Sequence, residues 1–334
     1  MNFSYFFLYL SQICEKYMKV IELLKNSHKT AFSFEILPPL KGNSFLKVCN
    51  IIDKLKEFDP KYINITTHHS ETIYRETADG RTEKVNIRKR PGTVAIASAI
   101  QNRYGITAVP HLICKGFSKE ETEYALIDLN FLGVSELLLL RGDDKKLESD
   151  AFPPGASHEH TTDLIEQVNN FNHGISVDGT SFEKMETPFS YGVACYPEKH
   201  EEAPDFESDL AFLKQKIEMG AEYAVTQMFF DNRKYFDFVE RCRNERIAVP
   251  IIPGIKPIVF QDQLTVLPQV FHTEIPEALA AELRKCKNDD EVKQVGVEWS
   301  VEQCRELIRR GVPSLHFYTL MATDSVRRIA EVIY

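Results

Sequence analysis

Short apolar segments that alternate with segments of helical periodicity are the feature that most constrains the fold of this chain. A short apolar run bounded by turn residues predicts a buried strand, and apolar residues three or four apart predict a helix. The predicted strands are residues 31–37, 62–66, 106–114, 137–140, 191–196, 224–229, 249–252 and 315–318. The predicted helices are residues 18–28, 45–58, 93–104, 118–132, 161–172, 208–219, 233–244, two or three within 260–310, and 323–334. Residues 70–92 and 143–158 are polar and are predicted as loops.

The number of strands decides between two α/β architectures. Eight strands that alternate with helices favour a single-domain (β/α)8 TIM barrel over a doubly wound sheet. No GxGxxG motif follows a predicted strand, which argues against a dinucleotide-binding doubly wound fold. We therefore expect residues 30–334 to form one barrel, after an N-terminal extension and leading helix over residues 1–29.

Charge and cysteine usage exclude several classes of protein. The net charge of −9 argues against a nucleic-acid-binding protein, which needs a basic face. The apolar stretch at residues 3–10 is too short to span a membrane and lacks the basic leader of a signal peptide. The seven cysteines are scattered and form no CxxC pair, so we expect a reducing cytoplasm rather than a disulfide framework.

The stretch FSFEILPP, residues 32–39, places a carboxylate near the C-terminal end of the first strand. Ser33 and Glu35 share one face of that strand, and Pro38 and Pro39 end it because they lack backbone donors. Burial among apolar neighbours raises the pKa of a carboxyl group, which can then act as a proton donor. The alternative is an ordinary glutamate in solvent at the end of a strand.

Polar residues recur where the other predicted strands end, which is where a barrel has its active site. These residues are Thr66, His111, Arg141-Gly142-Asp143, Tyr196, Gln227 and Pro253-Gly254. Each also has a structural interpretation. The Arg141-Gly142-Asp143 segment suits a ligand-binding loop or an ordinary turn, and a buried Gln227 suits a polar ligand or a tie within the core.

One helix carries two charges on a single face. Asp209 and Lys216 are seven residues apart in the predicted helix 208–219. Near a helix N-terminus such a face can meet a diphosphate or a ribose. The alternative is a solvated helix surface.

Eight stretches, in this order, resemble methylenetetrahydrofolate reductase, the flavoenzyme family of one-carbon metabolism. The stretches are FSFEILPP, YINIT, VPHLIC, LLRGD, CYPEKHEEA, AVTQMFFD, VPIIPGIKP and LHFYTL. They cover the chain from about residue 30 to residue 334. The chain is similar to the compact bacterial type of catalytic barrel, without the C-terminal regulatory domain of the eukaryotic enzymes.

The resemblance implies a barrel that holds non-covalent FAD at its mouth. In the family, NADH or NADPH reduces the flavin and leaves. 5,10-Methylenetetrahydrofolate then enters the same place, opens to a 5-iminium cation and is reduced to 5-methyltetrahydrofolate, which serves methionine synthesis. The implied partners are these small molecules and, because family members are often homo-oligomers, further copies of the chain. No nucleic acid and no membrane is implied.

The resemblance also implies roles for individual residues. Glu35 would be the general acid for ring opening, and Asp143 would lie by the flavin and the folate and stabilise the iminium cation. The implied FAD contacts are Thr66, His111, Arg141, Gly142, Asp143, Tyr196, His200, Ala203, Asp209 and Lys216. Gln227 would contact both nicotinamide and folate, and Gln263 would contact the folate. No metal is implied.

The chain departs from the family pattern in three places. Thr67 stands where the family often has tyrosine, and Met321-Ala322 stands where many members have Asn-Arg. The polar segment 70–92 is longer than in the compact members. These differences bear on the flavin side of the site and on contacts to the folate tail.

Three alternatives to the folate reductase stay open at this point. A metal-dependent barrel hydrolase could use His111 and His200, although no HExxH or HxH spacing is present. A second alternative is another flavin-dependent barrel oxidoreductase, such as a proline dehydrogenase. A third is a non-catalytic subunit that binds folate or flavin.

Overall fold

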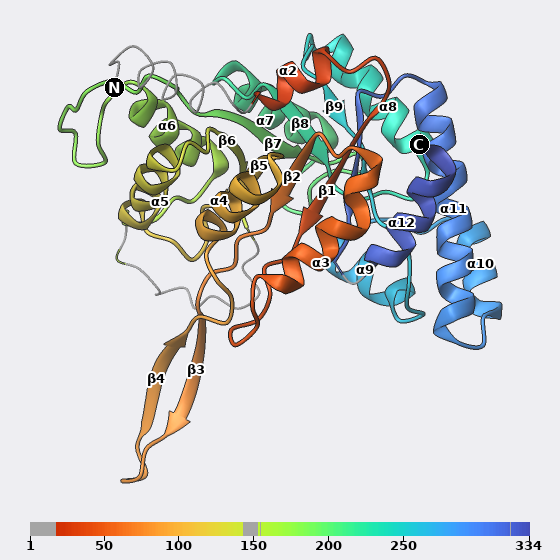
Figure 1. The fold of residues 1–334 in the computed structure, drawn as a ribbon, viewed down its shortest axis with the longest axis horizontal. Coiled ribbons are helices and arrows are strands. Elements are labelled where there is room, and N and C mark those ends of the chain that lie inside the picture. Colours follow the sequence, from red (N-terminus) through yellow and green to blue (C-terminus); the bar gives the residue numbers. More distant parts are fainter. Residues whose placement is uncertain (1–17, 143–152, 154, 321) are drawn as a thin grey trace, which may run out of the picture. The chain divides into compact units, whose positions relative to one another are not determined.

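The computed structural model describes residues 18–142, 153, 155–320 and 322–334. The chain divides into two compact units, and Figure 1 labels most of their helices and strands. Unit 1 includes Leu37–Val48 and Asn64–Tyr191, and unit 2 includes Val20–Ile36, Cys49–Ile63 and Gly192–Tyr334.

The elements follow the predicted alternation closely. Those of unit 1 are β3 (Glu71–Glu76), β4 (Thr82–Ile87), α4 (Thr93–Tyr104), β5 (Thr107–Ile113), α5 (Lys119–Phe131), β6 (Glu136–Leu140) and α6 (Thr161–Asn172). Those of unit 2 are α2 (Val20–Lys25), β1 (Ala31–Ile36), η1 (Lys56–Phe58), α7 (Phe206–Glu218), β8 (Tyr223–Thr226), α8 (Asn232–Asn244), β9 (Ile251–Ile252), β10 (Gly254–Ile255), α9 (Gln263–Phe271), α10 (Glu277–Lys285), α11 (Asp289–Arg309), β11 (Ser314–Tyr318) and α12 (Thr323–Ile333). The boundary between the units falls within α3 (Leu46–Leu55), β2 (Tyr62–Ile65) and β7 (Ser190–Cys195).

Nine strands form one sheet in the order β10-β11-β1-β2-β5-β6-β7-β8-β9. The pairs β1–β11, β10–β11, β5–β6, β7–β8 and β8–β9 are all parallel. The strands at the two ends of that order, β9 and β10, are consecutive in the chain and separated by Pro253. A parallel sheet that alternates with helices confirms the predicted (β/α)8 barrel.

Two predicted strands differ from the structure by more than one residue at an end. The sixth ends at Thr226, not at residue 229, and the Gln227 N–H makes the last ladder bond of β8, to the carbonyl of Cys195 at 2.8 Å. The seventh begins at Ile251, not at residue 249, and the sheet continues in β10 after Pro253, which has no N–H for the ladder. Gly254 resumes the sheet opposite His316.

The predicted loop at residues 70–92 was wrong, because most of this segment is a β-hairpin of unit 1 (Figure 1). Strands β3 and β4 pair antiparallel from Glu71↔Ile87 to Glu76↔Thr82. Gly80, at φ +77°, closes the turn and donates to the carbonyl of Thr77 at 2.9 Å. The segment lacks the apolar alternation of a half-buried strand because both faces of the hairpin are largely exposed.

Helix α5 begins where its sequence predicts. The Ser118 side chain accepts from the Glu121 N–H at 3.0 Å, and the Glu121 carboxylate accepts from the Ser118 N–H at 2.9 Å. This reciprocal pair is the predicted capping box. The predicted loop at 143–158 lies mostly outside the described residues.

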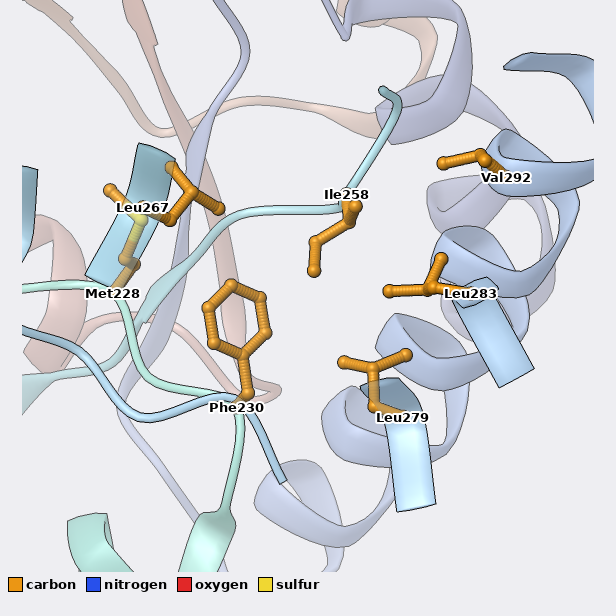
Figure 2. Close-up of a cluster of buried hydrophobic side chains, with 7 residues drawn as sticks. All are labelled: Met228, Phe230, Ile258, Leu267, Leu279, Leu283 and Val292. Carbon is orange, nitrogen blue, oxygen red and sulfur yellow. The ribbon is translucent and has the colours of Figure 1, made fainter. Parts of the chain in front are cut away.

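The core of unit 2 includes an apolar cluster to which helices α10 and α11 contribute side chains (Figure 2). Its buried members are Met228, Phe230, Ile258, Leu267, Leu279, Leu283 and Val292. Helix α11 approaches this cluster closely at Gly296, where an added Cβ would lie 2.0 Å from the carbonyl oxygen of Ile258. The glycine is therefore required for α11 to pack against the backbone at residue 258.

Replacement of Gly296 by alanine should destabilise the fold by about 2–4 kcal/mol, because a backbone carbonyl cannot rotate away as a side chain can. Gly92→Ala is the control, since a Cβ there meets nothing within 4 Å. It should cost less than about 1 kcal/mol. Urea unfolding of both variants measures the difference, and equal midpoints would contradict the close approach.

Candidate active site

Glu35 lies inside unit 2 at the C-terminal end of β1. Its position pairs with Tyr318 of β11, and Ser33 pairs with His316. The Ser33 hydroxyl lies 3.0 Å from Nδ1 of His316, so polar groups continue along this face of the two strands. Glu35 is 7% exposed, which confirms its predicted burial and excludes the solvated alternative.

Burial sets the protonation state of Glu35. Loss of hydration raises the pKa of its carboxyl group to about 8, and the positive charge of Lys256 opposes this rise. At pH 7 the carboxyl group is therefore mostly protonated, which is the state that a proton donor needs.

Aromatic rings and a glycine form the surroundings of this carboxyl group. The Tyr318 hydroxyl donates to the carbonyl of Thr226 at 2.7 Å. An added Cβ on Gly254 would lie 2.6 Å from the Tyr318 ring and 2.4 Å from the Thr226 carbonyl oxygen. The Pro253-Gly254 pair, predicted from its place after a strand, therefore keeps room for Tyr318 beside Glu35.

The side-chain carbonyls of Gln227 and Gln263 accept hydrogen bonds from nearby backbone N–H groups of unit 2. Gln227 is half-buried just after β8, and its Oε1 accepts from the Met228 N–H at 2.9 Å. Gln263 begins α9, and its Oε1 accepts from the N–H groups of Val259 and Phe260 at 2.7 and 3.1 Å. The placement of Gln227 inside a strand was wrong, but its side chain is held at the strand end.

The segment after β7 brings together several of the predicted FAD contacts. The Asp209 carboxylate accepts from the backbone N–H of His200 at 2.9 Å. The rings of Tyr196 and His200 meet edge to face, with centroids 4.6 Å apart. The buried Ala203 donates its N–H to the His200 carbonyl at 3.1 Å. These four residues therefore form one cluster.

Lys216 is anchored at the same end of β7. Its Nζ donates to the Ala194 carbonyl at 3.3 Å, and its side chain is half-buried. Helix α7 thus directs both Asp209 and Lys216 toward the β7 segment, as their shared face predicted. The alternative of a solvated helix surface is wrong for these two residues.

In unit 1 the predicted residues lie at the ends of β2, β5 and β6. His111 is 3% exposed in β5, opposite Leu138. Thr66 places its hydroxyl 3.2 Å from Nε2 of His68, whereas Thr67 donates its hydroxyl to the His111 carbonyl at 2.5 Å. Thr67, where the family often has tyrosine, therefore ties the end of β2 to β5.

Arg141 and Gly142 follow β6 directly. The Arg141 carbonyl accepts from the Lys115 N–H at 2.9 Å. Gly142 has φ +86°, a backbone conformation that favours glycine, and an added Cβ would lie 3.2 Å from the Ile113 side chain. Asp143, predicted as a catalytic and FAD-contacting residue, and Met321 lie outside the described residues.

Unit 1 also contains a cavity of about 670 Å³ between the end of β4 and helices α4 and α5. Arg88, Arg90, Phe117 and Tyr124 are among its lining residues. The two arginines come from the segment 70–92, which is longer than in the compact members of the family. Of the residues at the strand ends, sequence reasoning missed Lys256, although a lysine after the apolar VPIIPGI run was a visible signal.

A metal site and a membrane-spanning helix each require a recognisable arrangement of residues. No group of three or more histidine, cysteine, aspartate or glutamate side chains is arranged to hold a metal ion in the described part of the chain. Among those same residues, no helix is long and apolar enough to cross a membrane.

The fold and the strand-end residues define an α/β barrel protein with a buried, protonated carboxyl group at the end of its first strand. The family model for methylenetetrahydrofolate reductase matches residues 19–333, and the chain belongs to this family. The predicted resemblance is therefore confirmed.

Individual relatives carry the same family name. The Escherichia coli K12 protein "5,10-methylenetetrahydrofolate reductase" is 30% identical, over 90% of each chain. The Arabidopsis thaliana "Methylenetetrahydrofolate reductase (NADH) 1" is 32% identical over 92% of this chain, and the Caenorhabditis elegans "Probable methylenetetrahydrofolate reductase (NADPH)" is 29% identical over 93%. This chain spans only 49% and 43% of those two proteins.

A solved structure shares the fold. It is titled "Uncharacterized protein from Clostridium thermocellum binds two copies of 5-methyl-5,6,7,8-tetrahydrofolic acid" and has a TM-score of 0.54 at 14% identity. The match covers 93% of this chain and 97% of that chain. At this identity the likeness is one of fold alone.

Proposed function

We propose that this chain reduces 5,10-methylenetetrahydrofolate to 5-methyltetrahydrofolate, with FAD as cofactor and NADH or NADPH as the source of electrons, in a ping-pong reaction. Membership of the family supports the substrate class. The observation that carries the proposal is Glu35, a strand-end carboxyl group whose pKa burial raises to about 8. Relatives are named for NADH and for NADPH, so the proposal includes both.

The residues proposed to contact FAD fit its chemistry within each unit. In unit 1, Gly142 makes the positive-φ turn directly after β6 that glycine favours, and Arg141 precedes it. In unit 2, Lys216 offers a cation for a diphosphate, and the cluster of Tyr196, His200, Ala203 and Asp209 offers aromatic and polar groups. When bound, FAD would take electrons from the nicotinamide and pass them to the folate.

Further FAD contacts are proposed at Thr66 and His111 by their match to the family pattern. Both lie at the C-terminal ends of barrel strands in unit 1. Asp143 is proposed to lie by the flavin and the folate and to stabilise positive charge on the substrate. Its place in the sequence, directly after Gly142, supports this assignment.

Glu35 is proposed to open the five-membered ring of the substrate. Its O–H bond breaks and the proton passes to the departing amine nitrogen, while the C–N bond of the methylene bridge breaks. This leaves a carboxylate on Glu35 and an iminium cation on the folate. Gln227 and Gln263, which lie after β8 and at the start of α9, are proposed to hydrogen-bond the bound substrates.

Anaerobic half-reactions test this proposal. The purified protein, reconstituted with FAD if necessary, should be yellow. NADH or NADPH should bleach the flavin absorbance without folate present, and methylenetetrahydrofolate should then restore it. Protein that cannot be reconstituted with FAD would contradict the proposal, and restoration by proline-derived imine but not by the folate would favour a proline dehydrogenase.

The compartment in which the chain works and its place in metabolism are also proposals. The six cysteines in the described residues form no disulfide with one another, which supports a reducing cytoplasm. The proposed place of the reaction in metabolism is the supply of methyl groups for methionine synthesis.

A further inference from the structure

Lys256 is a buried lysine, and the strand pairing of the sheet relates its position to that of Glu35. It is 4% exposed and directly follows β10 in unit 2. Strand β10 pairs with β11 at Gly254↔His316 and Ile255↔Phe317. A buried lysine is rare unless another group compensates its charge, so its surroundings are informative.

The sheet register brings Lys256 level with Glu35. On the other side of β11, strand β1 pairs at Phe34↔Phe317 and Glu35↔Tyr318. The residue after Ile255 therefore comes level with Tyr318, as Glu35 does. Because side chains alternate along a strand, Lys256 shares the face of Gly254, against which the Tyr318 ring packs. Lys256 and Glu35 thus lie on the two sides of Tyr318.

Four other buried titratable groups of unit 2 are neutral at pH 7. Burial raises the pKa values of Tyr318, Tyr62 and Cys195, and it lowers that of His316 to about 3. Tyr196 is a further group whose charge would act on Tyr318. Lys256 supplies a positive charge that acts on the Glu35 carboxyl group.

Burial and charge also act on Lys256 itself. Loss of hydration lowers the pKa of its ammonium group to about 8, and the Glu35 carboxylate opposes this shift. At pH 7 the pair is therefore mostly a neutral carboxyl group beside an ammonium ion, and its protons come off in coupled steps.

We propose that Lys256 is a positioning residue for Glu35, and that its ammonium group stabilises the carboxylate that forms when Glu35 protonates the departing amine of the folate. This inference rests on the proposed function and deepens it. Lys256 keeps its own proton throughout, so the only proton that moves is that of Glu35. Burial keeps Glu35 protonated before reaction, and Lys256 limits the cost of losing that proton in the same dry surroundings.

The first test measures the protonation of Glu35 without turnover. The band of its protonated carboxyl group is identified by infrared spectroscopy as the band lost in Glu35→Gln, and it is titrated against pH. In Lys256→Met the midpoint should rise by about 1–3 pH units, because the opposite charge is lost. Lys256→Arg should keep it near or below the wild-type value.

The control is Lys285→Met, at a lysine whose side chain is 68% exposed. It should leave the midpoint unchanged. An unchanged midpoint in Lys256→Met would overturn the inference. If that variant does not fold, Lys256→Gln is titrated instead with the same expectation, since its amide is also neutral.

The second test separates the half-reactions. In Lys256→Met the folate-dependent step at pH 7 should slow by roughly 3- to 30-fold, because a weaker acid transfers its proton less readily. Its pH dependence should shift with the infrared midpoint, and Lys256→Arg should restore most of the rate. Equal slowing of the nicotinamide-dependent step would overturn the assignment. Failure of the wild-type protein to reduce folate would contradict the proposed function, while the infrared titration would still decide the role of Lys256.

Discussion

Glu35→Gln should lower the rate of folate reduction by roughly 10²- to 10⁴-fold, the usual contribution of a positioned general acid. Glutamine has nearly the same shape as a protonated glutamic acid, but it has no proton acidic enough to pass to the departing amine. The step in which the nicotinamide reduces the flavin involves no such proton transfer. That step should therefore keep a rate close to that of the wild type.

Stopped-flow measurement of flavin absorbance separates these two steps. Glu240→Gln is the matched control, because Glu240 is exposed on α8 and lies outside the proposed site. It should leave both steps unchanged. If Glu35→Gln slowed both steps equally, Glu35 would serve flavin binding or the structure of the site, and the acid role would be lost.

The same variant should be more stable than the wild-type protein at pH 8. The Glu35 carboxyl group ionises near pH 4.5 when the chain is unfolded and near pH 8 when it is folded. Between these values the folded state binds more protons, so wild-type stability falls as pH rises. Glutamine does not ionise, so the advantage of Glu35→Gln should grow across this window to on the order of a few kcal/mol.

Lys256 has the opposite linkage at higher pH. Its pKa is lowered from 10.5 to about 8 on folding, so between these values the unfolded state binds more protons. The contribution of Lys256 to the stability of the fold therefore rises with pH over this range. Together, Glu35 and Lys256 give the wild-type protein a minimum of stability near pH 8. Above that pH the advantage of Glu35→Gln should level off, because Glu35 is then ionised in both the folded and the unfolded state.

Urea unfolding at several pH values from 5 to 9 measures this difference between wild-type protein and Glu35→Gln. Glu240→Gln again serves as the control and should follow the wild-type curve. An advantage of Glu35→Gln that did not change with pH would mean that Glu35 ionises at the same pH in both states, and the protonated acid would have no physical basis.

Local patterns in the sequence predicted most elements of the fold. The capping box of Ser118 and Glu121 is made by residues three apart, so the same local sequence that shows it also builds it. The apolar neighbours of Glu35 in β1 favoured its burial but left a solvent-exposed glutamate open, and the structure decided for burial. The β3–β4 hairpin was missed because its exposed faces leave no apolar alternation to detect.

The partners of the candidate acid were decided by the tertiary structure. The Ser33 hydroxyl and Nδ1 of His316 lie 3.0 Å apart although the two residues are 283 positions apart in the chain. The same two strands, β1 and β11, pair Glu35 with Tyr318. The sequence alone determined that a carboxyl group lies near the end of the first strand, because strand periodicity is a local property. Only the tertiary structure decided that Lys256 comes level with it, because register between parallel strands is set by the packing of the whole sheet.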